Sequence, residues 1–408
     1  MKIIIVDSLF SPLGGGQKIA YDTYCVLKRN GHEVFYWAME KSPYFIENYE
    51  LSKYFTPYYS GTIDYIKNPI KYYYNYKALS DLQKFVDNIK PDIIHFQSFW
   101  GLSTAIFNVK TSAIKILTFH DVRSCPSTTL MYKAKQLCIE QRCKNGDFSQ
   151  CIRNKCVKNS LEASVRRVLA TLIDINNFKQ VDSYITPSNA LKQNIIEANL
   201  GIRTNKIVTI NNFLNKYELS IAPNYTNKSY FLYIGRLSKE KSVITLLQAM
   251  SELPRDIKLH IVGTGPEEEN LKKYAEENKL HNIEFLGFKT GADIQDEYQS
   301  CIATILPCNW FEIFGMTNIE SFANGKPVIA SNIGGIPEIV EHNVNGLLFE
   351  PANVEQLREC ILKYWNNPEL VVEHGEKGYE KVLTHYTEDI YYEKLIKLYE
   401  ETINEYKK

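Results

Sequence analysis

Residues 309–320 read Asn-Trp-Phe-Glu-Ile-Phe-Gly-Met-Thr-Asn-Ile-Glu and follow the apolar run 302–306. The apolar run predicts a buried strand, and Gly315 begins a predicted helix after a short loop. The first amides of a helix lack intrahelical partners and bind phosphate oxygens, so the amides of residues 316–318 predict an anion site. Polar groups at the carboxyl end of a strand, followed by a helix, indicate an open α/β sheet that binds its ligand at that end.

The two glutamates of this stretch, Glu312 and Glu320, are eight positions apart. Glu320 lies roughly one and a half turns into the helix, where its carboxylate can accept two hydrogen bonds from a vicinal diol. The segment is therefore interpreted as a cradle for a nucleotide sugar. A surface helix with an acidic first turn, which complements the helix dipole without a ligand, is the alternative.

Strand-like runs alternate with amphipathic helical stretches along the whole chain, which predicts parallel sheets with right-handed crossovers. Each half of the chain supplies one set of strands, and each set fits one Rossmann-like domain. In the first half the strands are predicted at residues 3–7, 33–37, 92–97, 115–120, 183–187 and 206–211. In the second half they are predicted at residues 230–235, 258–263, 283–286, 302–306, 327–330 and 346–349.

A chain of 408 residues is too long for one ordinary core and suggests two domains. The predicted boundaries are an N-terminal domain over residues 1–213, an Asn-rich linker over 214–228 and a C-terminal domain over 229–386. A terminal helix within residues 387–408 is expected to pack back on the first domain.

The chain has no net charge, but residues 1–213 carry 27 Lys and Arg against 17 Asp and Glu, whereas residues 214–408 carry 20 against 30. A basic first half suits an anionic membrane face or a phosphate-bearing acceptor, and attraction between the two halves is the alternative. Apolar runs long enough for a membrane span are missing from the sequence, and the first strand is unlike a signal peptide. We therefore expect a cytoplasmic protein.

Nine cysteines are distributed unevenly, and four of them form a C-x4-C-x7-C-x4-C array at Cys138, Cys143, Cys151 and Cys156. Four thiolates in a reducing compartment can hold a structural zinc ion. The spacings are looser than those of usual zinc knuckles, so free thiols and disulfides remain open alternatives.

Three loops after predicted strands carry groups suited to a phosphate-bearing ligand. Residues 11–17 form a glycine loop that includes Gly15 and Gly16; it allows close backbone approach but lacks the dinucleotide spacing, so a plain turn is the alternative. Arg236 and Lys241 follow another strand and could neutralise a diphosphate, although cations in such a loop also occur in solvent. Gly263 ends the next strand.

Two further features concern the first half of the chain. His120 and Asp121 end a predicted strand, where a histidine facing a cleft could bind a sugar hydroxyl or take a proton; a structural histidine is the alternative. Residues 58–77 combine seven tyrosines with three lysines, which is typical of a membrane-interface surface or of a partly buried aromatic helix.

Taken in order, these motifs resemble those of glycosyltransferase family 4, a large family of retaining glycosyltransferases with the GT-B architecture of two Rossmann-like domains facing each other across a cleft. The resemblance covers nearly the whole chain. The matching positions are Gly14 to Gly16, Pro91 to His95, His120-Asp121, Pro187-Ser188, Gly235-Arg236 with Lys241, Gly263 to Pro266, Glu312 with Glu320, and Gly334 to Glu338. The cysteine-rich insertion also resembles one found in part of the family.

The resemblance implies a role for each matching residue. Glu320 would bind the ribose hydroxyls, Arg236 and Lys241 the diphosphate, and Glu312 the donor sugar, while His120 would contact the sugar or the acceptor. The backbone of Phe314, Gly315, Met316 and Thr317 would complete the donor site. The family usually needs no catalytic metal, and sugar transfer is expected to depend on closure of the two domains.

The expected activity is transfer of a hexose or related sugar from a nucleoside diphosphate, most often UDP, to a lipid-linked or polysaccharide acceptor. No nucleic acid partner is expected. The protein is expected to contact the inner face of the cell membrane peripherally. A sugar-nucleotide 2-epimerase of the same architecture and a non-catalytic nucleotide-sugar or glycan-binding scaffold are the alternatives. Two positions depart from the family pattern: residues 211–215 read Asn-Asn-Phe-Leu-Asn at the hinge, and Ser242 stands where glycine is frequent.

Overall fold

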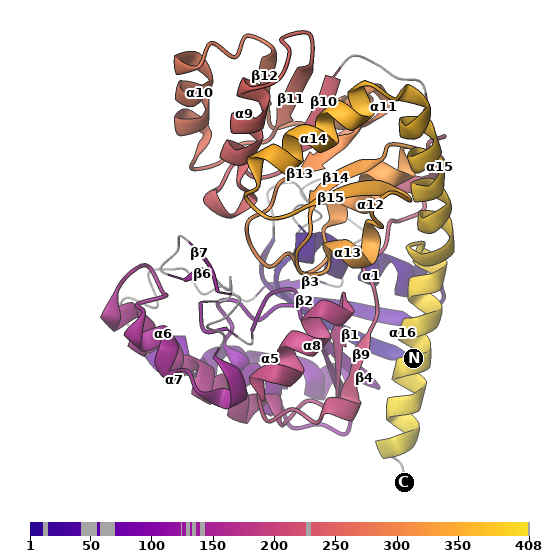
Figure 1. The fold of residues 1–408 in the computed structure, drawn as a ribbon. Helices are drawn as coiled ribbons and strands as arrows, with labels where there is room; N and C mark the ends of the chain where they lie inside the picture. The colour runs from indigo at the N-terminus through magenta and orange to yellow at the C-terminus, as the bar shows by residue number, and fades with distance from the viewer. Residues whose placement is uncertain are drawn as a thin grey trace. The chain divides into compact units, whose positions relative to one another are not determined.

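The computed structural model describes residues 1–10, 15–41, 55–57, 70–123, 125–127, 131–132, 136–138, 143–225 and 230–406 (Figure 1). The chain divides into two compact units. The first unit comprises Met1–Ala134, Cys138–Asn211 and Tyr391–Lys408, and the second comprises Lys135–Leu137 and Asn212–Ile390.

The first unit is built on a seven-stranded sheet with the order β3-β2-β1-β4-β5-β8-β9, and neighbouring strands pair in parallel. The strands are β1 (Lys2–Phe10), β2 (Glu33–Lys41), β3 (Phe55–Pro57), β4 (Ile93–Phe96), β5 (Ile114–Thr118), β8 (Ser183–Thr186) and β9 (Ile207–Thr209). Strands β4 and β8 are buried at every position, as expected for strands covered on both faces.

Helices connect these strands. They are α1 (Gly15–Arg29), α4 (Ile70–Tyr73), α5 (Tyr76–Ile89), α6 (Ser149–Arg153), α7 (Leu161–Phe178) and α8 (Asn189–Ala198), with the short 3-10 helices η2 (Thr104–Asn108), η3 (Lys144–Gly146) and η4 (Thr204–Lys206). Polar side chains fix several helix starts: Asn75, Ser160 and Ser188 each accept a hydrogen bond from an amide in the first turn.

The second unit contains a six-stranded parallel sheet with the order β12-β11-β10-β13-β14-β15. Its strands are β10 (Tyr230–Ile234), β11 (Lys258–Val262), β12 (Ile283–Gly287), β13 (Thr304–Leu306), β14 (Val328–Ser331) and β15 (Gly346–Phe349). This is the strand order of a classic doubly wound Rossmann sheet.

The helices of the second unit are α9 (Val243–Ser251), α10 (Glu268–Glu277), α11 (Gly291–Ser300), α12 (Met316–Ala323), α13 (Ile336–Ile339), α14 (Val354–Trp365) and α15 (Pro368–His385), with η5 (Glu218–Ser220) and η6 (Lys239–Lys241). Helix α9 contacts α10 and α14, and α12 contacts α13 and α15. The core between α9, α14 and the sheet is mostly aliphatic, with Leu246, Ile261 and Ile361 among its fully buried members.

All twelve predicted strands are present, with ends that shift by a few residues. Three strands were not predicted: β3, which includes Pro57, and the two-residue strands β6 (Met131–Tyr132) and β7 (Gln136–Leu137). Such short strands are set by tertiary pairing and carry little periodicity of their own.

The expected linker over residues 214–228 falls within the second unit. The segment from Asn212 onward belongs to the second unit, and Leu214 is fully buried in its core. The Leu214 amide donates to the Tyr386 carbonyl at 2.9 Å. An apolar side chain and a backbone hydrogen bond therefore fix the start of the segment whose Asn-rich composition indicated an interdomain linker.

The last helix, α16 (Glu388–Tyr406), contributes its residues from Tyr391 onward to the first unit. Three of its buried side chains hydrogen-bond to that unit: Tyr391 to Thr23 at 2.9 Å, Tyr399 to His95 at 2.7 Å, and Thr402 to Ser183 at 3.1 Å. Among the described residues, none of the helices is both long and apolar enough to cross a bilayer.

Candidate functional site

The strand order of the second unit changes direction between β10 and β13, which makes this the switch point where open α/β sheets bind ligands. The loop after β10 begins at Gly235, and the loop after β13 begins at Pro307. The Asn309 amide donates to the Glu240 carbonyl at 2.9 Å, so the two loops lie against each other. Residues 309–320, from which the fold was predicted, therefore follow a strand at the position where a ligand is expected.

An ion pair joins these two loops. Lys241 Nζ lies 2.6 Å from Glu312 Oε2, and the same oxygen accepts a hydrogen bond from Trp310 Nε1 at 3.2 Å. Lys241 Nζ also lies 5.1 Å from the centre of the Trp310 ring. Burial lowers the pKa of Lys241, but the adjacent Glu312 carboxylate outweighs burial and raises it overall. The ammonium group therefore keeps its charge in a largely buried place.

Arg236 supplies a second cation in the same loop. Its side chain is exposed and makes no hydrogen bond or ion pair with any other part of the chain that the structure describes. The five N–H donors of the guanidinium group are thus available to phosphate oxygens.

The start of α12 exposes amides next to this pair. Gly315 has φ +96°, and a Cβ atom there would lie 2.7 Å from Asn318 Nδ2. Within the described residues, the amides of Met316 and Thr317 have no hydrogen-bond partner. The prediction was wrong for Asn318, whose amide donates to the Gly315 carbonyl at 3.0 Å because the first turn is tight. Two free amides remain for an anion.

The side chain of Asn318 is an unpredicted part of the site. It is fully buried, and neither Oδ1 nor Nδ2 has a hydrogen-bond partner in the described residues. A buried amide without partners costs roughly 1 to 3 kcal/mol, which native proteins rarely accept without a functional reason. Its position one turn from Gly315 points to a ligand that pairs with it.

Close packing of glycine loops fixes the geometry around the ion pair. A Cβ atom on Gly263 would lie 1.9 Å from the Gly235 carbonyl oxygen, and one on Gly334 would lie 2.1 Å from the Glu312 carbonyl oxygen. The Gly335 amide donates to the same Glu312 carbonyl at 2.7 Å. These contacts hold the backbone of Glu312 in place.

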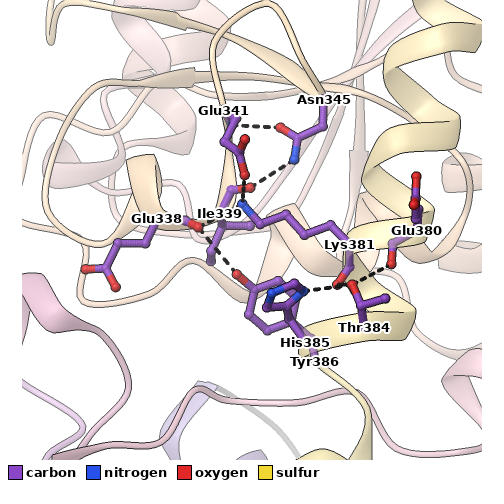
Figure 2. A network of polar contacts seen from close by, with 9 residues as sticks. All are labelled: Glu338, Ile339, Glu341, Asn345, Glu380, Lys381, Thr384, His385 and Tyr386. Carbon is purple, nitrogen blue, oxygen red and sulfur yellow. Dashed lines mark hydrogen bonds and ion pairs between the residues drawn. The ribbon is translucent and has the colours of Figure 1, made fainter.

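The segment that follows Gly334 and Gly335 is joined to α15 by polar contacts (Figure 2). Lys381 Nζ reaches the Glu338 carbonyl at 2.9 Å and Glu341 Oε1 at 2.6 Å, and the Glu341 amide donates to Asn345 Oδ1 at 2.8 Å. Polar contacts thus connect α15 to α13, the helix that directly follows Gly334 and Gly335, and to Glu341.

Glu320 lies one and a half turns along α12 and accepts a hydrogen bond from Tyr298 Oη at 2.8 Å. It borders a cavity of about 650 Å³, whose other lining residues include Leu214, Tyr217, Ile221 and Ile294. This size is typical of small-molecule sites. Burial raises the pKa of Tyr298, so the phenol stays protonated and directs its hydrogen toward the Glu320 carboxylate.

The first unit has a matching arrangement at its own switch point, between β1 and β4. His120 follows β5 and donates from Nε2 to Gln97 Oε1 at 2.7 Å, while Gln97 follows β4. Gly16 lies at the start of α1, and a Cβ atom there would lie 3.0 Å from His120 Cβ. Gly16, Gln97 and His120 therefore meet at the carboxyl edge of the sheet.

Burial lowers the pKa of His120 to about 4, so the imidazole is neutral at physiological pH. Because Nε2 donates to Gln97, Nδ1 carries the lone pair and can accept a hydrogen bond from a hydroxyl group. The neighbouring Asp121 forms an ion pair through Oδ1 with Arg123 Nε at 2.7 Å. These features favour hydrogen bonding over proton abstraction.

The remaining predicted residues divide into three groups. Phe314 is a core residue whose ring packs edge-on against Tyr386, so its backbone and not its side chain is near the site. Gly15 is exposed, and a Cβ atom there would meet nothing within 4 Å. Gly14 and residues 58–69 of the tyrosine-rich stretch 58–77 lie outside the described residues.

The cysteine array lies in the first unit, and in the part of the chain that the structure describes no disulfide joins its cysteines. Cys151 shares a hydrogen bond with Cys156, and burial raises the pKa of Cys143 to about 12. Across the described ranges, no group of three or more His, Cys, Asp or Glu side chains is arranged to hold a metal ion. Structural zinc at Cys138, Cys143, Cys151 and Cys156 stays a prediction, which elemental analysis of the purified protein can decide.

Comparison with known proteins bears on these two units. Residues 13–216 match the sequence model of Glycosyltransferase Family 4, and residues 218–381 match that of Glycosyl transferases group 1. The chain belongs to glycosyltransferase family 4. This confirms the family that the spaced glutamates and glycine loops indicated.

Curated relatives of this family 4 glycosyltransferase align over part of their length. An uncharacterized glycosyltransferase of Methanocaldococcus jannaschii is 33% identical over 49% of this chain and 54% of its own. The O-antigen chain mannosyltransferase C of Escherichia coli is 29% identical over 42% of this chain and 46% of its own. The chain thus spans about half the length of these relatives.

Solved structures cover nearly the whole chain. Anabaena HepE in complex with UDP has a TM-score of 0.73 at 17% identity and covers 97% of this chain and 99% of its own. Sucrose-phosphate synthase from Thermosynechococcus elongatus has a TM-score of 0.74 at 18% identity, and the match covers 98% of this chain and 99% of its own. These likenesses show the predicted GT-B fold.

Proposed function

We propose that this family 4 glycosyltransferase transfers a sugar, with retention of configuration, from a UDP-sugar to a lipid-linked or polysaccharide acceptor. The observation that carries the proposal is the convergence of donors between β10 and β13. Arg236, Lys241, the free amides of Met316 and Thr317, and the unpaired side chain of Asn318 belong to this one region. A sugar diphosphate offers the several anionic oxygens that such a group of donors requires.

The choice of UDP is supported by the likeness to HepE, whose solved structures include complexes with UDP and with UDP-glucose. The choice of a glycan acceptor is supported by the names of two relatives, an O-antigen chain mannosyltransferase and a poly(glycerol-phosphate) alpha-glucosyltransferase. The donor sugar is a hexose in this proposal.

In the proposed reaction the second unit binds the donor. Glu320 accepts hydrogen bonds from the ribose hydroxyls, and Tyr298 keeps that carboxylate in place. Arg236, Lys241 and the α12 amides stabilise the negative charge that develops on the leaving diphosphate, which lowers the barrier by a few kcal/mol for each donor. Because these groups supply positive charge, no catalytic metal is needed.

The first unit supplies acceptor contacts in this proposal. The neutral His120 accepts a hydrogen bond through Nδ1 from a sugar or acceptor hydroxyl, and Gly16 leaves room beside it. The attacking hydroxyl passes its proton to the leaving diphosphate, because His120 is too weak a base to take it at neutral pH. The reaction is proposed to take place in the cytoplasm, at the inner face of the cell membrane.

The test begins with a thermal-shift screen of UDP-, GDP- and ADP-sugars, since a specific ligand raises the melting temperature by mass action. Turnover of the selected donor is then compared among the wild type, Arg236→Ala and Glu312→Ala. Unchanged turnover in both variants would refute the assignment of the site. Release of free sugar without an acceptor, with epimerisation, would identify a 2-epimerase, and binding without turnover would identify a scaffold.

A further inference from the structure

Helix α7 of the first unit exposes an apolar stripe. Leu161, Val165, Leu169 and Leu172 have 54%, 37%, 50% and 50% of their surface accessible to solvent. At 100° per residue these four positions fall within an arc of about 80°. The other side of the helix carries buried residues such as Ala170 and Phe178, and α7 contacts η2. The helix is therefore packed on one face and leaves aliphatic side chains unpacked on the other.

An exposed stripe of this kind needs an explanation. Single exposed aliphatic residues are common on protein surfaces, but contiguous ones mark sites of interaction. A surface helix normally carries polar residues on the face opposite its packed side. The outer face of α7 carries these four aliphatic residues, with the exposed Asn176 among them and the exposed Glu162 at their edge.

Basic residues surround the stripe. Lys158 precedes the helix, Lys179 follows it, and Arg166 lies at its side; all three are exposed. None of them forms an ion pair with another described residue. Between residues 153 and 179 the sequence has six basic and two acidic residues, and one of the acidic ones, Asp174, is buried and pairs with Arg167 at 3.5 Å. The outer face is thus largely apolar, and the exposed charges around it are mainly basic, with Glu162 as the exposed acidic residue of this stretch.

Tyrosines border the same face. Helix α4 contacts α7, and the Arg166 guanidinium lies 5.2 Å from the centre of the Tyr72 ring. Tyr73 stacks edge-on against Tyr72 with ring centres 5.2 Å apart. Tyrosine is enriched at the level of lipid headgroups, where its ring and its hydroxyl meet different surroundings.

We propose that the outer face of α7 binds an anionic membrane surface. Leucine and valine side chains enter the boundary between headgroups and acyl chains, while Lys158, Lys179 and Arg166 meet lipid phosphates. An amphipathic helix that lies in the membrane plane has this combination of an apolar stripe and flanking cations. Charge complementarity favours a lipid surface over a second copy of this chain, because two copies would bring like charges together.

The same helix is connected to the acceptor side of the first unit. Arg167 Nε donates to the Pro126 carbonyl at 3.0 Å, in the segment that follows His120 and Asp121. Strand β8, which follows α7, pairs with β5, at whose end His120 lies. Membrane binding through α7 thus brings a lipid-linked acceptor to the unit that carries His120. This last step rests on the proposed function; membrane binding itself does not.

The experiment measures flotation of the purified full chain with vesicles of phosphatidylcholine alone or mixed with phosphatidylglycerol. The wild type is expected to float with the anionic vesicles, and less so at high salt. The double variant Leu169→Ser/Leu172→Ser is expected to bind at least about tenfold more weakly. Lys158→Gln/Lys179→Gln is expected to lose roughly fivefold per charge on anionic vesicles only.

The matched control is Leu383→Ser, which removes a leucine of α15 that is 45% exposed; its binding should equal that of the wild type. Donor hydrolysis without vesicles should be equal in all variants, so a failure of membrane binding is distinguishable from a failure of the enzymatic assignment. The proposal is overturned if the wild type ignores anionic vesicles or if the serine variant floats equally well. It is also overturned if light scattering shows a dimer that the serine variant dissociates, because a second copy would then occupy α7.

Discussion

Lys241 Nζ and Glu312 Oε2 lie 2.6 Å apart and join the loops that follow β10 and β13. The two residues are 71 positions apart in the chain, and the pair exists because β10 and β13 are neighbours in the sheet. Lys241 is thereby fixed beside the free amides of α12. The pair organises the site, and its removal should affect catalysis more than other ion pairs of the same unit.

Glu312→Gln is predicted to lower kcat about 10²- to 10³-fold, because Lys241 and the donor sugar both lose their negatively charged partner. The free energy of unfolding should fall by about 3 kcal/mol, since a largely buried ammonium is left without its counter-charge. Turnover and thermal unfolding measure the two effects. Glu297→Gln is the control, because Glu297 pairs with Lys289 and His260 away from the site. Equal losses of kcat in both variants would contradict the prediction.

Tyr298→Phe is predicted to weaken UDP binding about tenfold, the usual loss for one hydrogen bond to a charged group. The variant keeps the ring and removes only the hydroxyl that donates to Glu320. Because Tyr298 acts through Glu320 in the proposed ribose site, kcat at saturating donor should remain unchanged. Calorimetry with UDP measures the affinity, and steady-state kinetics separate the change in KM from any change in kcat. Tyr364→Phe, which removes a hydroxyl bonded to His374 in the same unit, should leave UDP affinity intact.

Asn318→Leu is predicted to stabilise the protein by about 1 to 3 kcal/mol and to weaken donor binding. The native side chain is fully buried with both polar atoms unpaired, so an apolar residue of similar size removes a desolvation cost. Thermal unfolding without ligand and calorimetry with the donor measure the two changes. A lower melting temperature would show that Asn318 has partners in the folded protein after all.

Two neighbouring glycines provide a test of the site in the first unit. Gly16→Ala is predicted to displace His120, because the added Cβ atom would lie 3.0 Å from His120 Cβ, and turnover should fall about tenfold or more. Gly15→Ala introduces the same methyl group into open space and should keep wild-type activity. Similar turnover in both variants would mean that His120 has no close contact with the substrate.

The sequence predicted the parts of the site that lie close together in the chain. Glu312, Gly315 and Glu320 belong to one strand-loop-helix segment, and the rule that ligands bind at the carboxyl ends of strands is independent of the strand order. Lys241 was also predicted because it follows a strand, although its pairing with Glu312 was not.

The sequence did not predict contacts between distant segments. Tyr298 reaches Glu320 from α11, and Gln97 reaches His120 from a neighbouring strand. Neither tyrosine nor glutamine has a pattern that marks such a contact, since the pairing depends on which strands and helices become neighbours. Leu214 shows the same limit: its Asn-rich surroundings indicated a linker, whereas packing against the second core decided its place.

Buried titratable groups of the first unit predict how stability depends on pH. Burial lowers the pKa of His95 to about 3, below its ordinary value of 6.5, so the folded state binds this proton less tightly than the unfolded state does. Stability contributed by neutral His95 is present above pH 6.5 and is lost as the pH falls below it. At pH 5 the loss is about 2 kcal/mol. Burial raises the pKa of Asp7 from 3.8 to about 7, so the effect of pH on stability through this group is opposite to that of His95.

Stability linked to Asp7 is present below pH 3.8 and is lost as the pH rises through 7. Acidification from pH 8 to pH 5 should therefore restore about 2 to 3 kcal/mol of this group's contribution to the free energy of unfolding. The two groups therefore oppose each other between pH 8 and pH 5. Asp7→Asn should make the protein more acid-labile than the wild type, and His95→Asn should make it less so. Melting temperatures at pH 5 and pH 8 measure both slopes. Equal slopes in the two variants would show that neither group is perturbed by burial.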